Sequence, residues 1–138
     1  MNIKIILEGK IKEPYFKLGI EEFKKRLLKK VEVLEVSNIF EYIKNKTGAY
    51  IVTLEIEGKM LSSEEFAQKL REIEISGTTN EILFLIGGAE GLSKEVRDLS
   101  DFKLSMSKMT FLHQEATFIL IEQIYRAYKI LNNEPYHK

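Results

Sequence analysis

Several residue types that carry catalysis or covalent stabilisation in other proteins are scarce in this chain. Its 138 residues include no cysteine and no tryptophan, and only two prolines and two histidines. Without cysteine, disulfide bridges, thiolate metal sites and a cysteine nucleophile are excluded. The two histidines, His113 and His137, stand near opposite ends of the last segment, so protein side chains alone are not expected to hold zinc. We therefore expect no metal.

An excess of charge of either sign is also missing. Lysine plus arginine and aspartate plus glutamate both number 21, which gives a formal net charge of zero. A protein that coats nucleic acid non-specifically carries a positive excess, so this class is disfavoured, whereas an enzyme that meets RNA through one local patch remains open. Zero net charge also leaves self-association unopposed by charge repulsion.

Long apolar runs are absent as well. The first apolar run, "IKIILEG", carries Lys4 and Glu8 and is too short for a signal peptide or a membrane span. We therefore expect a cytoplasmic protein. At this length the whole chain, residues 1–138, is expected to form a single domain.

Strand and helix patterns alternate along the sequence. Apolar runs rich in β-branched residues predict strands at 3–8, 31–36, 49–56, 81–86 and 102–105. Helical spacing and capping residues predict helices at about 14–30, 38–46, 62–73, 93–99 and 111–131, with a turn at 57–59. This alternation predicts an α/β fold with a mostly parallel sheet of five or six strands and helices on both faces. Ligands of such sheets collect at the carboxyl ends of the strands.

The last predicted helix, 111–131, has apolar residues on nearly every face. A sheet covers only one stripe of a helix, so the rest of this surface needs a second partner. A second copy of the chain around a two-fold axis is one solution. A central helix that its own chain covers is the other.

The stretch "FLIGGAEGL", 84–92, ends a buried strand in a glycine-rich turn. It is no Walker loop, because it carries Glu90 and has no lysine before Lys94. It is no dinucleotide fingerprint either, because the glycines have the wrong spacing and follow the fourth strand instead of the first. A tight turn with positive φ at Gly87 or Gly88 is the purely structural alternative.

Two further stretches, 53–59 and 104–114, also follow predicted strands, so three strand ends can converge on one pocket. Backbone amides, glycines and the side chains of Leu54, Met106 and Met109 would dominate its walls. Such walls suit a flat purine and a sulfonium group, beside which a carboxylate such as Glu90 is tolerated. Either methionine can equally be core filler.

Four stretches carry a family resemblance: "LIGGAEGL" at 85–92, "LSMSKMTFLHQ" at 104–114, "IEQIYRAYKI" at 121–130 and "PYHK" at the end. Together they resemble the SPOUT-class methyltransferases that methylate N3 of a pseudouridine in 23S rRNA of the large ribosomal subunit. The resemblance runs along nearly the whole chain. It implies S-adenosylmethionine as cofactor, a deep trefoil knot in the C-terminal half, an obligate homodimer and 23S rRNA in the large subunit or assembled ribosome as partner.

The resemblance also implies particular site residues. The cofactor contacts fall on Leu54, Gly87, Met106, Ser107, Lys108, Met109, Thr110 and Phe111. The candidate catalytic residues are His137 and Tyr136 in the C-terminal tail, with Tyr136 stacking on or orienting the base, and Arg126, which holds RNA or pairs across the dimer. For His137 and Tyr136 the alternative is that they belong to a disordered surface tail with no function.

Two positions depart from the family pattern. Leu112 stands where the family has proline, and Thr117 stands where it has arginine. Because guanidinium groups grip phosphates and bases bidentately, the second departure motivates an alternative function, a catalytically weak RNA- or ribosome-binding protein with the same fold. A third hypothesis is an unrelated α/β nucleotide-binding module. The basic run 24–30, "KKRLLKK", is a candidate for phosphate contacts or simply a solvated face.

Overall fold

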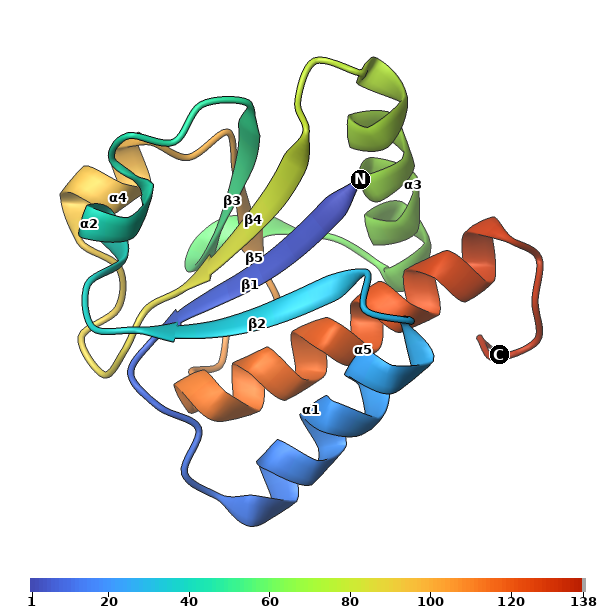
Figure 1. The fold of residues 1–138 in the computed structure, drawn as a ribbon, viewed down its shortest axis with the longest axis horizontal. Helices are drawn as coiled ribbons and strands as arrows, with labels where there is room; N and C mark the ends of the chain where they lie inside the picture. Colours follow the sequence, from blue (N-terminus) through green and yellow to red (C-terminus); the bar gives the residue numbers. More distant parts are fainter. Residues whose placement is uncertain (138) are drawn as a thin grey trace.

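The computed structural model describes residues 1–137 and has one parallel sheet of five strands (Figure 1). The strands are β1 (Asn2–Glu8), β2 (Val31–Val36), β3 (Ala49–Met60), β4 (Glu81–Ile86) and β5 (Phe102–Ser105). The helices are α1 (Pro14–Arg26), α2 (Ile39–Ile43), α3 (Ser63–Ser76), α4 (Lys94–Asp98) and α5 (His113–Leu131). The strand order is β2-β1-β4-β3-β5, and every neighbouring pair is parallel. The predicted fold class is confirmed.

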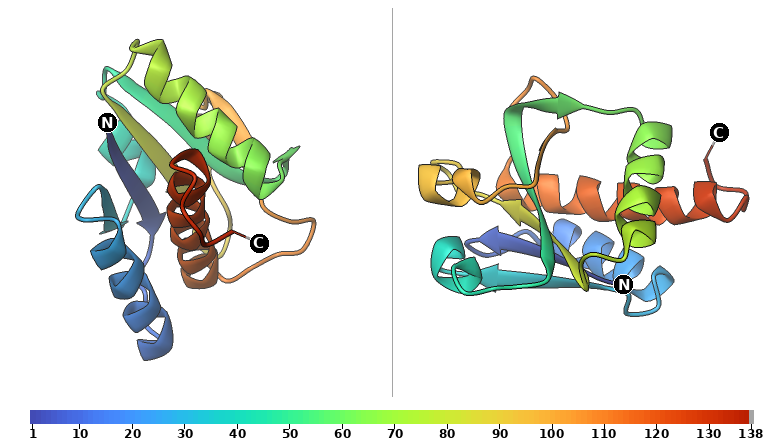
Figure 2. Two further views of the ribbon diagram at one scale, coloured as in Figure 1. Left: turned by 90° about the vertical axis from the view of Figure 1, so that its right-hand side faces the viewer. Right: turned by 90° about the horizontal axis from the view of Figure 1, so that it is seen from above.

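Helices cover both faces of the sheet. The larger helices α1, α3 and α5 pack on one face, and the short helices α2 and α4 pack on the other (Figure 2). Successive strand residues point to opposite faces, so in β1 Ile3, Ile5 and Leu7 join the larger core while Ile6 joins the smaller one. β4 is apolar throughout because it lies in the middle of the sheet and is buried on both sides.

Local capping agrees with the sequence. Ser62 and Glu65 form the predicted capping box at the start of α3. Asn38 accepts a hydrogen bond from the Glu41 N–H and caps α2. Helix α1 begins at Pro14. Proline has no N–H, and at the first position of a helix an N–H would have no intrahelical acceptor, so no hydrogen bond is lost.

The predicted turn at 57–59 is wrong. β3 continues to Met60, and both Leu54 and Lys59 pair with Leu104 of β5, so the residues between them bulge out of the ladder. Gly58 lies in this bulge, and a Cβ there would come within 2.8 Å of the Lys103 backbone. The glycine therefore lets the strand return to β5 after the bulge, which sequence patterns read as a turn.

Helix α5 is the central helix of its layer and lies between α1 and α3 (Figures 1 and 2). Its residues from His113 to Leu131 are all buried or half-buried. On the α1 side, Gly19 makes room for Phe118, whose ring would come within 2.4 Å of a Cβ at that position. The chain itself thus covers much of the apolar surface of α5, although Phe118, Ile119 and Tyr125 are only half-buried.

Among the helices described between residues 1 and 137, none is long and apolar enough to cross a bilayer.

Candidate functional site

The bulge of β3 and the segments at the carboxyl ends of β4 and β5 surround one pocket with a volume of about 690 Å³. This size is typical of sites for nucleotide-sized ligands. Seven of the eight expected cofactor contacts line it: Leu54, Gly87, Met106, Ser107, Met109, Thr110 and Phe111. The eighth, Lys108, is exposed and does not line the pocket. The expected convergence on one pocket is therefore present in the tertiary structure, with the bulge of β3 in place of a strand end.

The glycine turn forms one wall through close backbone contacts. A Cβ at Gly87 would lie 2.4 Å from the Gly91 carbonyl carbon, so only glycine fits. The Gly91 N–H donates to the Gly88 oxygen at 3.0 Å and closes the turn. Positive φ occurs at Gly91, +76°, and not at Gly87 or Gly88 as the structural alternative expected. The turn needs its first glycine for space and its last for backbone conformation.

A second wall is the loop 105–110 between β5 and α5. The buried Ser105 hydroxyl donates to the Ser107 carbonyl at 3.1 Å, and the Ser107 Oγ accepts from the Met109 N–H at 2.9 Å. These side chain to backbone bonds fix an otherwise irregular loop. Met106 packs against the core, whereas Met109 is 75% exposed at the pocket wall and is not core filler.

The acidic group of the pocket is Glu55. Glu90 is exposed and does not line the cavity, although the sequence drew attention to it. The Glu55 Oε2 atom accepts from the Thr53 hydroxyl at 2.6 Å and lies 3.3 Å from Lys103 Nζ. Sequence reasoning missed Glu55, although it directly follows Leu54 in "TLE". A half-buried carboxylate at an apolar pocket favours a cationic ligand.

His113 connects the pocket to the first loop of the chain. Its ring lines the cavity, and its Nε2 atom lies 3.0 Å from the Lys10 carbonyl oxygen. This contact with the backbone gives the ring a structural role in addition to its place in the pocket wall. The same ring is thus part of the site and an anchor for the loop.

The candidate catalytic residues Arg126, Tyr136 and His137 lie close to one another but outside the pocket. The Tyr136 hydroxyl and the Arg126 guanidinium both donate to Glu122 Oε2, each at 2.8 Å. Arg126 also lies 3.1 Å from His137 Nδ1 and 4.8 Å from the centre of the Tyr136 ring. His137 Nε2 is 3.4 Å from a carboxylate oxygen of Glu64. Glu122 is therefore the residue on which this cluster is built, and the sequence analysis did not single it out.

Protonation in this cluster follows from its contacts. Burial, with the hydrogen bond to Glu122, raises the pKa of Tyr136 above its usual value near 10, so the phenol stays protonated at neutral pH. A guanidinium can only donate, so in this geometry His137 Nδ1 is an acceptor and the ring proton is on Nε2. Tyr136 is thus a hydrogen-bond donor and not a base.

The pocket and this cluster lie at opposite ends of α5. His113 and Ala116 of the first turn line the pocket, whereas Arg126 is near the last turn and the tail follows it (Figure 1). A helix of 19 residues is about 28 Å long. The basic run 24–30 lies at the cluster end, where Arg26 pairs with Glu22 and stacks over Tyr125. One subunit therefore does not bring the cofactor and catalytic candidates together.

Comparison with protein families gives a match over residues 1–137 to the family described as "Predicted SPOUT methyltransferase". The chain belongs to the SPOUT methyltransferase family. Among its curated relatives, "Ribosomal RNA large subunit methyltransferase H" of Clostridioides difficile (strain 630) is 47% identical over 160 aligned positions, which cover 100% of both chains. The protein of the same name from Finegoldia magna is 46% identical over 160 positions, again covering 100% of both. The suspected family is therefore confirmed.

Solved structures share the fold of this SPOUT methyltransferase. A probable methylase family protein from Haemophilus influenzae Rd KW20 aligns with a TM-score of 0.63 and 13% identity, covering 99% of this chain and 70% of that one. The SpoU methyltransferase AviRb from Streptomyces viridochromogenes, solved with AdoMet, aligns with a TM-score of 0.53 and 14% identity over 91% of this chain and 57% of that one. At these identities the likeness concerns the fold.

This SPOUT methyltransferase is short for its family. The 160 aligned positions exceed its 138 residues by 22, and α2 is joined to β3 by residues 44–48 alone. The two departures noted in the sequence lie at α5. Leu112 is the N-cap, with φ −60° and no capping side chain, and is 59% exposed. Thr117 is completely buried, and its hydroxyl donates to the His113 carbonyl at 2.8 Å.

Proposed function

We propose that this SPOUT methyltransferase transfers a methyl group from S-adenosylmethionine to N3 of a pseudouridine in 23S rRNA of the large ribosomal subunit. The observation that carries the proposal is the pocket formed by the β3 bulge and the ends of β4 and β5 in a chain of this family. The names of its relatives, ribosomal RNA large subunit methyltransferase H, supply the substrate class. As an enzyme of ribosomes it would work in the cytoplasm.

The pocket fits the cofactor in size and chemistry. Because Gly87 has no side chain, the backbone of Gly91 and Leu92 packs directly against it, and this wall of the pocket is mostly main chain, which a flat purine can approach closely. Met106, Met109, Leu54 and Phe111 supply apolar walls, and Glu55 supplies a carboxylate. When bound, S-adenosylmethionine supplies an activated methyl group next to a positive sulfur. The protein therefore has to position two reactants and exclude water, and positioning alone contributes roughly 7–11 kcal/mol.

The tail cluster fits the substrate side of the reaction. The target nitrogen of the base must lose its imide proton, and a hydrogen-bond donor that stabilises the resulting anion assists this loss. Arg126 is such a donor, because its guanidinium has N–H groups beyond the one bonded to Glu122, whereas the single O–H of Tyr136 is already donated to Glu122. An aromatic ring and a guanidinium are also the groups on which unpaired RNA bases stack. We assign Tyr136, Arg126 and His137 to the binding of the base.

A homodimer resolves the separation between pocket and tail. The two sets of residues lie at opposite ends of α5, and the half-buried side chains Phe118, Ile119 and Tyr125 keep some apolar area that a second subunit could cover. In a two-fold dimer the tail of one subunit can complete the pocket of its partner. The trefoil knot of the family also belongs to this proposal. Its support in this chain is that β3 lies between β4 and β5, both of which follow it in sequence.

The proposal is tested with large subunits or ribosomes from cells that lack this protein. We expect calorimetry to show binding of S-adenosylmethionine, and mass spectrometry of the 23S rRNA to show one added methyl group on a pseudouridine only after incubation with protein and cofactor. No methylation of subunits, ribosomes or free rRNA would contradict the proposal. Thermal stabilisation by ATP but not by S-adenosylmethionine would point instead to an unrelated nucleotide-binding module.

A second candidate is a catalytically weak protein that binds RNA or ribosomes. The observation that favours it is Thr117, which is wholly buried and bonded within its own helix where the family has arginine. Binding of cofactor and ribosomes without methyl transfer would support this second function.

A further inference from the structure

The connection between β1 and α1 is irregular, yet three successive backbone N–H groups in it are bonded by side chains. The Ile11 N–H donates to Glu35 Oε2 of β2 at 2.6 Å. The Lys12 and Glu13 N–H groups both donate to Gln114 Oε1 of α5, at 2.9 and 3.0 Å. Gln114 is only 8% exposed, so the chain commits a nearly buried amide to this loop. Loops with no partner of this kind are usually mobile.

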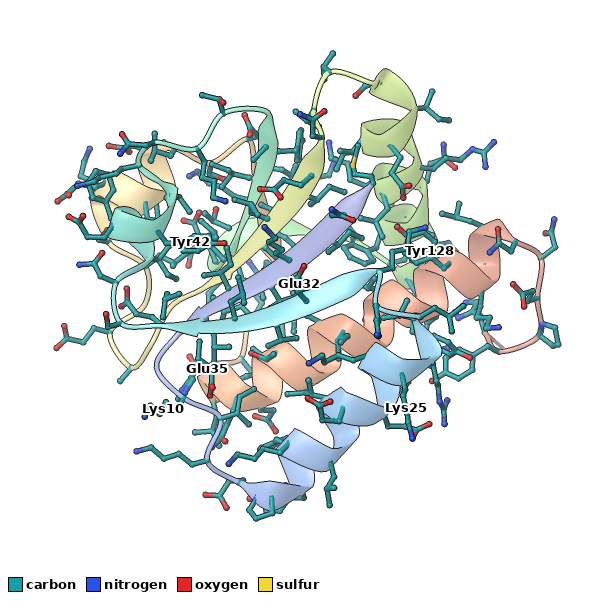
Figure 3. All side chains as sticks on the ribbon, viewed as in Figure 1. Lys10, Lys25, Glu32, Glu35, Tyr42 and Tyr128 are labelled. Atoms are coloured by element: carbon teal, nitrogen blue, oxygen red, sulfur yellow. The ribbon has the colours of Figure 1, made fainter. Side chains whose placement is uncertain are left out.

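A fourth anchor links the loop to the pocket. The ring of His113, which lines the pocket, lies 3.0 Å from the Lys10 carbonyl. On the other side of the pocket mouth, a Cβ at Gly88 would lie 3.2 Å from the Glu8 carbonyl. The loop therefore borders the cofactor pocket, and Figure 3 shows Lys10 and Glu35 at the end of the molecule where α5 begins.

Two lysines leave this fixed loop toward solvent. Lys10 and Lys12 are exposed, while Ile11 between them is 8% exposed and packs into the core. Because Ile11 turns inward, its two neighbours turn outward. Within residues 1–137 neither lysine is within ion-pair distance of a carboxylate. The nearby Glu35 carboxylate is already an acceptor for the loop backbone.

We propose that residues 9–13 form a preorganised phosphate clamp, in which Lys10 and Lys12 contact the sugar–phosphate backbone of the RNA beside the target nucleotide. This inference rests on the proposed rRNA methyltransferase function. A fixed loop loses little conformational entropy when it binds, so two ammonium groups held in place bind a polyanion better than two on a mobile loop.

The basic run 24–30 is a weaker candidate for this contact. It lies at the far end of α1, and its Lys24 and Arg26 are already paired with Glu21 and Glu22. Lys10 and Lys12, by contrast, have no such pair within residues 1–137, and they belong to a loop whose Lys10 carbonyl contacts the pocket-lining ring of His113. The clamp therefore contacts RNA near the reacting base, whereas the run contacts it at a distance or not at all.

The test compares Lys10→Gln/Lys12→Gln with wild type, using large subunits from cells that lack this protein. The control is Lys44→Gln/Lys94→Gln, which removes the same number of positive charges from the C-cap of α2 and from α4, on the other face of the sheet, where they are paired with Glu41 and Asp98. We expect the clamp variant to lose about tenfold or more in kcat/KM through KM, with cofactor affinity and melting temperature unchanged. The slope of log(kcat/KM) against log[salt] should become shallower by about 1.4 to 1.8, because each phosphate contact contributes about 0.7 to 0.9.

Gln114→Leu tests the anchoring separately. Gln114→Leu should raise KM in the wild-type background. Once Lys10 and Lys12 are both replaced it should have little further effect on KM, because the Gln114 amide contributes to RNA binding only by positioning these lysines. A merely structural role would lower stability and activity equally in both backgrounds.

The outcomes separate this inference from the proposed function. If wild type methylates the subunits and the clamp variant does so with unchanged KM and salt slope, the clamp is refuted and the function stands. A weaker affinity for S-adenosylmethionine in the clamp variant would also overturn the inference, because the loop would then belong to the cofactor site. If wild type binds ribosomes without methylating them, the function fails, and direct binding measured across salt concentrations still tests the clamp.

Discussion

Gly87 shows how a single missing side chain shapes the pocket. Its neighbour across the turn is the backbone of Gly91, only 2.4 Å from where a Cβ would stand. Backbone cannot rotate away as a flexible side chain can, so any other residue must displace the turn itself. This wall of the pocket depends on that contact, and not on an unusual φ at Gly87.

We therefore predict that Gly87→Ala weakens the affinity for S-adenosylmethionine at least tenfold and destabilises the fold by about 1–3 kcal/mol. Calorimetry and urea unfolding measure the two effects. The control is Gly77→Asn at the end of α3, where φ is +65° and the nearest atom to a Cβ is 3.9 Å away. Asparagine tolerates this conformation, so the control should keep cofactor affinity. Equal affinities for all three proteins would contradict the prediction.

Leu112 differs from its family at a position where proline suits the backbone. Its φ of −60° matches that of a proline ring, and among residues 1–137 its N–H donates no hydrogen bond. We predict that Leu112→Pro stabilises the protein by about 0.4–1 kcal/mol, because it restricts the unfolded chain. The midpoint of urea unfolding measures this change. A lower midpoint would show that residue 111 is strained by the substitution.

At the scale of elements, α3 and α5 are joined by a hydrogen bond between side chains. The Tyr128 hydroxyl donates to Glu74 Oε1 at 2.7 Å, and Figure 3 shows Tyr128 between the two helices. Burial, and then the bond to Glu74, raises the pKa of Tyr128 far above its usual value. The bond therefore stabilises the packing of α3 on α5 wherever the phenol stays protonated.

This raised pKa predicts an alkaline loss of stability. Below pH 10 the phenol is protonated in both states, and its contribution to folding is fully present. As the pH rises above about 10, the unfolded phenol ionises while the folded one is held protonated, so this contribution is progressively lost. Tyr128→Phe lacks the effect. We expect the stability difference between wild type and Tyr128→Phe, measured by urea unfolding, to shrink between pH 9 and pH 11. A constant difference would contradict this account.

At the scale of the whole molecule, the length of α5 separates the pocket from the cluster of Arg126, Tyr136 and His137. The pocket has an apolar wall and no tail residue, while the tail cluster has donors and no cofactor site. In the proposed function both sets of residues act in one methyl transfer, so that function predicts that the tail of one subunit completes the pocket of its partner.

Subunit mixing tests this requirement. Gly87→Ala impairs the pocket and Tyr136→Phe/His137→Ala impairs the tail, so each homodimer should have little activity when the cofactor concentration is kept well below the weakened Kd of Gly87→Ala. In an equal mixture of exchanging subunits, half of the dimers are mixed and each mixed dimer holds one complete site, which restores about a quarter of the wild-type activity. Sedimentation measures the oligomeric state in the same samples. A monomer, or a mixture of exchanging subunits without recovered activity, would contradict the composite site.

Much of this architecture follows from local patterns. For β2, β4 and β5 the bounds predicted from the sequence, 31–36, 81–86 and 102–105, are those of the structure. The capping box at Ser62 is equally local. The bulge in β3 was mistaken for a turn, because Glu57-Gly58-Lys59 has turn composition and only the pairing with β5 distinguishes the two.

The sequence by itself determined the alternation of strands and helices, the family and seven of the residues that line the pocket, because these depend on spacing and on motifs. Tertiary structure decided which face each helix covers, that Glu55 and not Glu90 faces the cavity, and that Glu122 joins Arg126 to Tyr136. It also decided that α5 keeps pocket and tail apart. These facts depend on contacts between residues distant in the chain, and no local pattern encodes them.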